Sequence, residues 1–190
     1  YKREPSFPIA VACDPAFNFV YEANIRYLHH LGEVTYFSPL ADTSLPDAGF
    51  VYLPGGYPEL YLAALSANRQ MLQSIRRYVE SGGKLLAECG GMMYLCDEIR
   101  DKNGYVYPMA GVLHQSATME NMKLRLGYRT LLYNETRLKG HEFHYSRLVE
   151  QQNPLPSCAV AYTAKGVETD TPLYHYKNVW AGYTHLYWRS

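Results

Sequence analysis

The chain has neither an excess of one charge nor a long hydrophobic run. Its 18 lysines and arginines balance 18 aspartates and glutamates, so the formal net charge is zero. A strongly basic surface that would attract nucleic acid is therefore not expected. No apolar stretch approaches the length of a membrane span and no signal peptide is visible, so we expect no partner in a membrane.

Cysteine is scarce, with four among 190 residues. No two of them form a CxxC pair, and their spacing matches no metal-binding pattern. A chain of this length can form a full hydrophobic core without disulfides, so we expect free thiols, no metal site and a cytoplasmic location. The four residues are Cys13, Cys89, Cys96 and Cys158.

The chain begins with Tyr1 and not with methionine, and a polar segment follows. We expect residues 1–8 to be a linker and residues 9–190 to form one domain of a longer polypeptide. No internal repeat or low-complexity segment interrupts residues 9–190, so no further domain boundary is expected there.

The first half of the sequence alternates short apolar runs with segments of helical spacing. Strands are predicted at residues 8–13, 34–37, 49–53 and 84–88, and helices at 18–31 and 68–80. Alternation at these lengths predicts an α/β fold with a parallel, doubly wound sheet.

The second half contains predicted strands with little helix between them. These strands cover residues 127–133, 140–147, 158–163 and 179–185. Consecutive strands with short connections are typical of antiparallel pairing, so we expect them to extend or flank the parallel sheet.

A predicted strand ends abruptly at Cys89. Gly90 and Gly91 follow, and then apolar residues with helical spacing. This pattern predicts a strand, a sharp turn and a helix, which would present a nucleophile at the carboxyl edge of the sheet. The start of the helix should lower the pKa of the Cys89 thiol. The alternative is a buried structural cysteine before a glycine-rich turn.

A second glycine-bearing turn follows the predicted strand at residues 49–53. Ligands of open α/β sheets bind at the carboxyl ends of the strands, so this turn and the Cys89 turn should meet. Backbone N–H groups of Gly55 or Gly56 and of Gly90 could then form an oxyanion hole, and a side chain at Gly55 or Gly56 should lower turnover more than stability. The alternative is an ordinary turn. A phosphate loop is disfavoured because no GxxxxGK[ST] pattern occurs.

A cysteine nucleophile usually needs a histidine base. His185 ends a late apolar strand and suits this role. His141 and His144 lie in a segment that resembles HExxH, but residue 145 is tyrosine and strand periodicity separates the two rings, so no metal site is expected. The remaining histidines are expected on a helix surface (His29, His30), in a loop (His114) and after a turn (His175).

Four segments occur in a fixed order: Pro-Gly-Gly-Tyr-Pro-Glu at 54–59, Ala-Glu-Cys-Gly-Gly-Met-Met-Tyr-Leu at 87–95, Gly-His-Glu-Phe-His-Tyr-Ser at 140–146 and Tyr-Thr-His-Leu at 183–186. Together they resemble the C-terminal glutaminase domains of the cobyrinic acid a,c-diamide synthases, a branch of the class I glutamine amidotransferases. The resemblance extends from Ile9 to Trp188. It implies a flavodoxin-like three-layer sandwich in which antiparallel strands extend a central parallel sheet.

The resemblance implies that glutamine is hydrolysed through a glutamyl thioester, with Cys89 as nucleophile and His185 as base. In the wider class a glutamate two residues after the histidine completes a triad. Here that position is Tyr187. The branch resembled lacks the glutamate, which leaves open what orients His185.

The same resemblance implies the partners of this domain. Ammonia would pass to an N-terminal synthetase domain, which uses ATP and magnesium to activate the a and c carboxylates of cobyrinate, a corrinoid, in cobalamin biosynthesis. ATP and magnesium would then belong to that absent domain, and this domain would need no cofactor of its own.

Recognition of glutamine requires partners for its α-amino and α-carboxylate groups. Glu142 and His144 should share one face of a strand, and Arg129 on a neighbouring strand could bind the α-carboxylate through two hydrogen bonds. The alternative is that Arg129 and Glu142 form a structural ion pair or contact the missing domain.

Three other functions remain open. The domain could serve another acceptor, such as a different tetrapyrrole or a cell-wall lipid. A cysteine peptidase or other hydrolase could use the same architecture and would need no synthetase. A non-catalytic binding domain would carry an inert Cys89.

Overall fold

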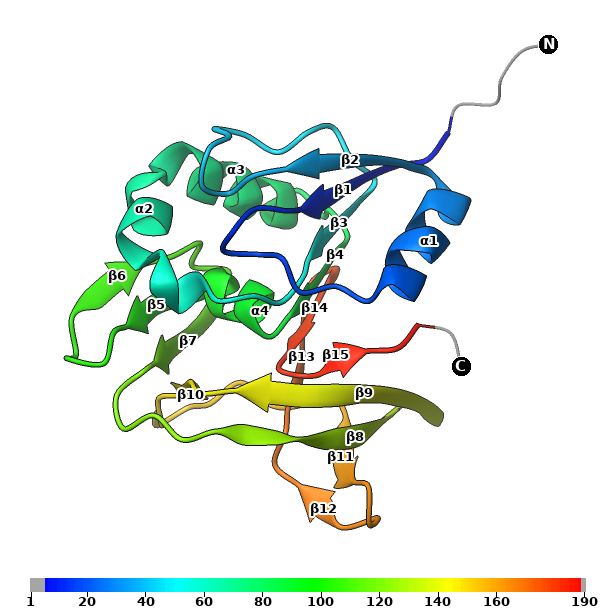
Figure 1. The fold of residues 1–190 in the computed structure, drawn as a ribbon, viewed down its shortest axis with the longest axis vertical. Coiled ribbons are helices and arrows are strands. Elements are labelled where there is room, and N and C mark those ends of the chain that lie inside the picture. Colours follow the sequence, from blue (N-terminus) through cyan, green and yellow to red (C-terminus); the bar gives the residue numbers. More distant parts are fainter. Residues whose placement is uncertain (1–5, 189–190) are drawn as a thin grey trace.

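The computed structural model describes residues 6–188 (Figure 1). Residues 1–5 of the expected linker therefore lie outside the described residues. Pro8 belongs to the first strand, and the carbonyl of Phe7 accepts a hydrogen bond from the N–H of Glu33. The linker expectation is wrong for these two residues, because their backbones take part in the fold.

A six-stranded central sheet has the order β13-β14-β4-β3-β1-β2. All neighbours are parallel except β13, which is antiparallel to β14. The expected parallel sheet is therefore confirmed. Its strands are β1 (Pro8–Ala12), β2 (Glu33–Phe37), β3 (Phe50–Leu53), β4 (Leu85–Glu88), β13 (Leu173–Tyr176) and β14 (Val179–Gly182).

Helices cover both faces of the central sheet (Figure 1). Alternate residues of the buried strands point to opposite faces, so one strand contributes to two cores. On one face, Ile9 and Val11 pack against Leu28 of helix α1 (Glu22–Leu31). On the other face, Ala10 and Ala12 of β1 belong to a core that also contains residues of α2 (Leu62–Ala67), α3 (Arg69–Glu80) and α4 (Gly90–Leu95). This arrangement forms the expected three layers.

The helix predicted at 68–80 matches α3, and the side chain of Asn68 caps it by accepting a hydrogen bond from the N–H of Met71. Helix α1 begins at Glu22, later than predicted, because residues 18–21 are extended and Phe19 forms an isolated bridge to Gly55. Helix α2 and a short 3-10 helix, η1 (Pro58–Leu60), were not predicted.

Most strands of the second half form two separate sheets, so only β13 extends the central sheet with antiparallel pairing. The four-stranded sheet has the order β10-β7-β5-β6 and the five-stranded sheet the order β12-β11-β8-β9-β15. His114 lies on β7 and not in a loop, and His175 lies on β13. The strands are β5 (Cys96–Arg100), β6 (Val106–Pro108), β7 (Leu113–Thr118), β8 (Arg125–Tyr133), β9 (Thr136–His144), β10 (Arg147–Leu148), β11 (Val160–Thr163), β12 (Glu168–Thr169) and β15 (His185–Leu186).

The strand predicted at 179–185 is divided in two. Strand β14 ends at Gly182, a bend follows at Tyr183, and β15 begins at His185. Strand β14 pairs with β4 of the central sheet, whereas β15 pairs with β9 of the five-stranded sheet. The bend therefore carries His185 from the carboxyl edge of the central sheet to the junction of two sheets.

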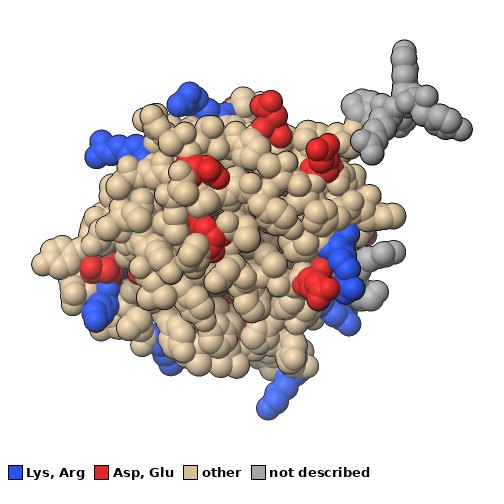
Figure 2. Space-filling model, turned by 45° about the horizontal axis from the view of Figure 1, so that its top comes forward, with Lys and Arg blue, Asp and Glu red and all other residues tan. Residues whose placement is uncertain are grey.

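The charged side chains on the face shown in Figure 2 are scattered, and neither sign gathers into a patch there. This agrees with the balanced composition. Among the described helices, none combines the length and the apolar character that crossing a membrane requires.

Candidate active site

Cys89 occupies a strained turn between β4 and α4. Its backbone has φ 51° and ψ −108°, a conformation that side-chain-bearing residues rarely adopt. The Cys89 N–H donates to the carbonyl of Gly182 at 2.7 Å, and the Cys89 carbonyl accepts from the N–H of Met93 at 3.1 Å. The strand, sharp turn and helix predicted from the sequence are confirmed, and neighbouring elements hold the turn in place.

The two glycine-bearing turns meet beside Cys89. A Cβ built on Gly90 would lie 3.3 Å from the backbone nitrogen of Gly56, so these two backbones are in contact. The N–H of Gly90 also forms a hydrogen bond with the Cys89 sulfur. The backbone of Gly56 therefore lies beside the Gly90 turn and lines the same cavity as Cys89, which is where an oxyanion hole would need its donors.

Gly55 and Gly56 are needed for different reasons. A Cβ on Gly55 would lie 2.2 Å from Cε1 of His185, so its absence makes room for the imidazole. Gly56 has φ +154°, and its Cβ would lie 2.2 Å from the carbonyl oxygen of Ala16. A side chain at Gly56 would therefore strain the backbone as well, which corrects the expectation that turnover would suffer more than stability there.

Cys89 and His185 line the same cavity, which has a volume of about 260 Å³. They reach it from different sheets, Cys89 from the carboxyl end of β4 and His185 from β15. The structure thus brings together the two residues that the sequence indicated as nucleophile and base. The other lining residues are Phe19, Gly56, Tyr57, His141 and Phe143.

The imidazole of His185 is held by packing. The ring of Phe19 meets it edge-on with centroids 4.5 Å apart, and Gly55 lies against it. Within residues 6–188 no side chain hydrogen-bonds this ring. Burial, with smaller effects from His141 and His144, lowers the pKa of His185 to about 4. His185 is therefore neutral at pH 7 and can accept a proton.

The Cys89 thiol is more buried than the sequence suggested. Burial, with the nearby carboxylate of Glu59, raises the pKa of Cys89, and the hydrogen bond from Gly90 only partly opposes this. The expectation of a lowered pKa is wrong, because α4 has only six residues and Cys89 is 4% exposed. The thiol is neutral until a base takes its proton.

Strand β9 separates the cavity from a buried polar network. His141 and Phe143 point into the cavity, and the Cys89 thiol donates to the carbonyl of Phe143 at 3.5 Å. Glu142 and His144 point to the other side, as the two-residue period of a strand requires. The predicted separation of His141 and His144 on opposite faces is confirmed.

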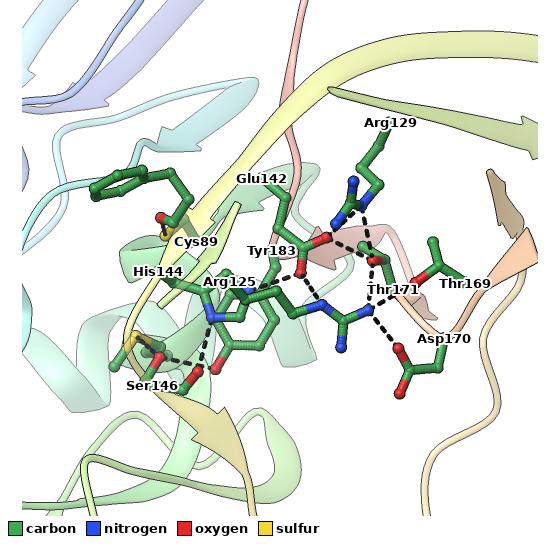
Figure 3. Close-up of polar contacts among 12 residues, drawn as sticks. Cys89, Arg125, Arg129, Glu142, His144, Ser146, Thr169, Asp170, Thr171 and Tyr183 are labelled. Carbon is green, nitrogen blue, oxygen red and sulfur yellow. Dashed lines mark hydrogen bonds and ion pairs between the residues drawn. The ribbon is translucent and has the colours of Figure 1, made fainter. Parts of the chain in front are cut away.

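Glu142 is the centre of this network, and it is only 1% exposed (Figure 3). Its carboxylate accepts hydrogen bonds from Arg129 at 2.7 Å, Thr171 at 2.6 Å and His144 at 2.7 Å. Arg125 adds an ion pair at 3.1 Å. These donors outweigh the opposing effect of burial and lower the pKa of Glu142 to about 2.

His144 is occupied on both ring nitrogens. Nδ1 lies 2.7 Å from the carbonyl oxygen of Ser146, and Nε2 lies 2.7 Å from the carboxylate of Glu142. Because both partners are acceptors, both nitrogens act as donors. The ring also stacks on Tyr183 at 3.6 Å. His144 therefore has no free nitrogen with which to act as a base for Cys89.

The structure contains the ion pair that the sequence left as an alternative role for Arg129 and Glu142. Arg129 lines neither the Cys89 cavity nor the larger cavity of about 890 Å³ on the other side of β9, whose wall includes Glu142, His144 and Arg125. Arg129 is only 8% exposed, and its guanidinium binds Glu142. Their part in glutamine recognition stays a prediction without geometric support.

Replacing Glu142 by glutamine should lower the free energy of unfolding by about 3 kcal/mol, because Arg129 and His144 would lose a buried charged partner. The lowered pKa of Glu142 contributes stability above about pH 4.5 that is lost as pH falls toward 2, so the variant should also lose that acid dependence. Denaturant unfolding measures both effects. Glu98→Gln is the control, because it breaks a more exposed ion pair with Arg100 and should lower the free energy of unfolding by less than about 1 kcal/mol. Equal losses of stability in the two variants would contradict this prediction.

Sequence reasoning did not place four of the lining residues in the cavity. Phe19 precedes α1 in an extended segment, and Tyr57 follows the Gly55–Gly56 turn. His141 and Phe143 could have been placed together by their two-residue spacing. Glu59 was quoted only as part of a motif, yet one of its carboxylate oxygens is buried without a hydrogen-bond partner and it raises the pKa of Cys89.

The four cysteines are free thiols. Among residues 6–188, no group of three or more histidine, cysteine, aspartate or glutamate side chains is arranged to hold a metal ion. The residues around Cys89 therefore offer acid–base and nucleophilic groups together with backbone donors.

Curated relatives match nearly the whole chain. The hydrogenobyrinate a,c-diamide synthase of Pseudomonas aeruginosa is 40% identical over 185 residues, which cover 94% of this chain and 41% of that protein. The cobyrinate a,c-diamide synthase of Fusobacterium nucleatum is 40% identical over 188 residues, with the same coverage. The chain therefore spans about two fifths of the length of these relatives.

Solved structures share the fold at low sequence identity. PurLQS from Thermotoga maritima superposes with a TM-score of 0.63 at 18% identity, over 95% of this chain and 87% of that one. A glutamine amidotransferase superposes with a TM-score of 0.60 at 16% identity, over 93% and 89%. The α/β fold expected for a class I glutamine amidotransferase is thus confirmed. A family model, the CobB/CobQ-like glutamine amidotransferase domain, matches residues 8–190, and the chain belongs to this family.

Proposed function

We propose that this domain hydrolyses glutamine through a thioester on Cys89, with His185 as the base, and delivers ammonia to an ATP-dependent synthetase. The observation that carries the proposal is the shared cavity, in which a cysteine on a strained turn meets a neutral histidine beside the glycine-bearing turns of Gly56 and Gly90. Nucleophile, base and oxyanion donors are the groups that acyl transfer needs.

The reaction begins with two neutral groups. As the Cys89 sulfur attacks the carboxamide carbon of glutamine, its proton passes to the His185 ring. The carbonyl oxygen becomes an oxyanion, which the N–H groups of Gly56 and Gly90 stabilise. The His185 imidazolium then gives its proton to the leaving nitrogen, ammonia departs, and water hydrolyses the thioester to glutamate with His185 again as base.

The cavity is too small for the acceptor of the ammonia. At about 260 Å³ it lies just below the range of roughly 300–1,000 Å³ that is typical of ligand sites. An amino acid fits such a space, whereas a corrinoid macrocycle does not. The acceptor, ATP and magnesium therefore belong to a synthetase domain, in agreement with relatives more than twice as long as this chain.

The relatives' names favour a corrinoid acceptor and amidation of its a and c carboxylates, and we propose this reaction, a step of cobalamin biosynthesis, for the parent enzyme. Relatives named for hydrogenobyrinate and for cobyrinate are equally similar, at 40% identity each. Overall similarity therefore does not favour one of these acceptors over the other. The free thiols fit a reducing compartment, and we propose a cytoplasmic location.

A glutamine-like electrophile such as 6-diazo-5-oxo-L-norleucine tests the proposal. It should label Cys89 selectively, and glutamine should protect against labelling, because the reagent shares the amino-acid head group. Peptide mass spectrometry locates the label, and ammonia release from glutamine measures turnover. Cys96 is equally buried and is the internal control. Labelling of another cysteine, or no protection by glutamine, would contradict the proposal and favour a peptidase or a non-catalytic domain.

The pH dependence of kcat/KM should report the lowered pKa of His185. Protonated His185 cannot accept a proton, so activity should be lost only as pH falls through about 4, well below the ordinary value for histidine. His141 contributes to this lowering, and His141→Gln should therefore move the inflection to higher pH. A pH–rate profile of both proteins measures the shift. An inflection that stays in place in His141→Gln would contradict the assignment.

A further inference from the structure

His185 lies on a strand of only two residues, and no carboxylate follows it at the usual place. Tyr187 occupies the position two residues later, but its ring lies against Tyr21, with centroids 4.5 Å apart. The His185 ring itself is in contact with Phe19 and Gly55 and has no hydrogen-bond partner among the described residues. Its orientation therefore depends on this packing and on the backbone of β15.

One edge of β15 is fixed by β9. His185 pairs with His141, and Leu186 pairs with Gly140. A Cβ on Gly140 would lie 2.3 Å from the carbonyl oxygen of His185, so this close approach needs a glycine. The pairing fixes the strand on one side only, because the backbone groups of successive residues in a strand point in opposite directions.

The other edge of β15 is held by buried side chains of β4 and α1. The N–H of Leu186 donates to the Glu88 carboxylate at 2.9 Å, and the carbonyl of Leu186 accepts from the Asn24 amide at 2.8 Å. Asn24 also accepts from the N–H of Trp188 at 3.2 Å. The second oxygen of Glu88 accepts a hydrogen bond from the Tyr52 hydroxyl.

A glutamate at position 88 lowers the stability of the fold when its carboxylate is ionised. It is 2% exposed, and the groups around it are Tyr52 on β3, the adjacent Cys89 thiol, Tyr21 before α1 and the backbone of Leu186, none of which carries a positive charge. The indole N–H of Trp188 is buried nearby without a well-formed hydrogen bond. A buried carboxylate with neutral neighbours weakens a fold unless hydrogen bonds offset the burial.

The fold raises the pKa of Glu88 above its ordinary value. Burial raises it to about 7, although hydrogen bonds from Tyr52 and Leu186 act in the opposite direction. Because the pKa is higher in the folded state, stability from this group is present below about pH 4.5 and is lost as pH rises through about 7. At higher pH the residue costs stability, so stability does not account for its presence.

We infer that Glu88 is the positioning residue for His185: its carboxylate fixes the backbone of Leu186 and so holds the neighbouring imidazole in the Cys89 cavity. Since Glu88 directly precedes Cys89, one peptide unit carries the nucleophile and the group that aligns its base. Asn24 completes the attachment from α1. The inference rests on the proposed function and supplies the orienting group that Tyr187 does not.

Glu88→Gln tests this in the complete polypeptide that carries this chain. The amide keeps the shape but has one acceptor oxygen, whereas the ionised carboxylate has two, which accept from the N–H of Leu186 and the hydroxyl of Tyr52, so the hold on Leu186 weakens. We expect kcat for glutamine to fall roughly 10- to 100-fold while KM changes less than about threefold, because proton transfer suffers and binding does not. The midpoint of denaturant unfolding should stay near that of the wild type. Glu80→Gln, which changes an exposed carboxylate paired with Lys177, is the matched control and should have no effect on kcat.

A double-mutant cycle separates positioning from a general structural role. Alkylation of Cys89 by iodoacetamide, followed by peptide mass spectrometry, reports proton removal from the thiol and does not require glutamine. Glu88→Gln should slow alkylation about tenfold when His185 is present and have no effect in a His185→Ala background. Equal slowing in both backgrounds, or a change in KM alone, would overturn the inference.

A second variant covers the case in which Glu88→Gln fails to fold. Asn24→Ala removes the contacts to the Leu186 carbonyl and the Trp188 N–H and should give the same His185-dependent slowing. If it alkylates at the wild-type rate, the inference fails. The proposed function fails separately, if the wild-type protein neither releases ammonia from glutamine nor reacts at Cys89 with the glutamine-like electrophile.

Discussion

Replacing Cys89 by serine should lower glutamine hydrolysis by roughly 10⁴-fold or more, the size of loss seen when a catalytic nucleophile is removed. A serine hydroxyl is a far weaker nucleophile than a thiol, and the substitution leaves the rest of the site unchanged. Synthesis by the parent enzyme with added ammonia should continue, because that chemistry takes place in the other domain. Ammonia release from glutamine and amide formation from ammonium salts measure the two activities.

Cys96→Ser is a suitable control for this prediction. Cys96 is as buried as Cys89, it lies one helix away, and its thiol donates to the Met92 carbonyl at 3.5 Å. The substitution should leave turnover within about threefold of the wild type. A Cys89→Ser protein that still hydrolyses glutamine at a comparable rate would disprove the nucleophile assignment and, with it, the proposed thioester.

The fold of the first half could be predicted because its signals are local. Apolar runs bounded by glycine or proline located β1, β3 and β4, and Asn68 and the following apolar spacing located α3. In the second half the predicted strands match β8, β9, β11, β14 and β15, whereas β5, β6, β7, β10, β12 and β13 were not predicted. The assignment of the strands to three sheets could not be predicted, because the partner of a strand depends on contacts distant in sequence. The break between β14 and β15 could not be predicted for the same reason, because β14 pairs with β4 and β15 pairs with β9.

Part of the candidate site could also be predicted from local signals in the sequence, and part could not. Cys89 and Gly90 could be predicted because a strand ends at a cysteine that precedes two glycines. His185 could be predicted because it lies at the end of a strand. The raised pKa of Cys89 was not predictable, since it depends on burial and on Glu59, which the fold brings close. Arg129 and Glu142 were grouped correctly, and the ion pair that the structure contains was the alternative that the sequence left open.

Replacing Gly55 by alanine should lower kcat by about 100- to 1,000-fold with a small effect on stability. The new methyl carbon would lie 2.2 Å from Cε1 and 3.0 Å from Nδ1 of His185, which is shorter than any tolerable contact. Gly55 has no left-handed backbone conformation, so the turn itself accepts alanine. The imidazole must therefore move, and a displacement of about 1 Å near the reacting atoms can cost about 100-fold.

The imidazole cannot move far, because Phe19 packs against its ring and Leu186 is tied to Glu88 and Asn24. Displacement should therefore act on proton transfer, with KM for glutamine changed less than kcat. Gly56→Ala is the informative comparison, since its methyl group would meet the Ala16 carbonyl and should lower the unfolding midpoint together with turnover. Steady-state kinetics and denaturant unfolding of both variants measure the difference. A fully active Gly55→Ala protein would show that His185 is not the base, since the base would have been displaced without consequence.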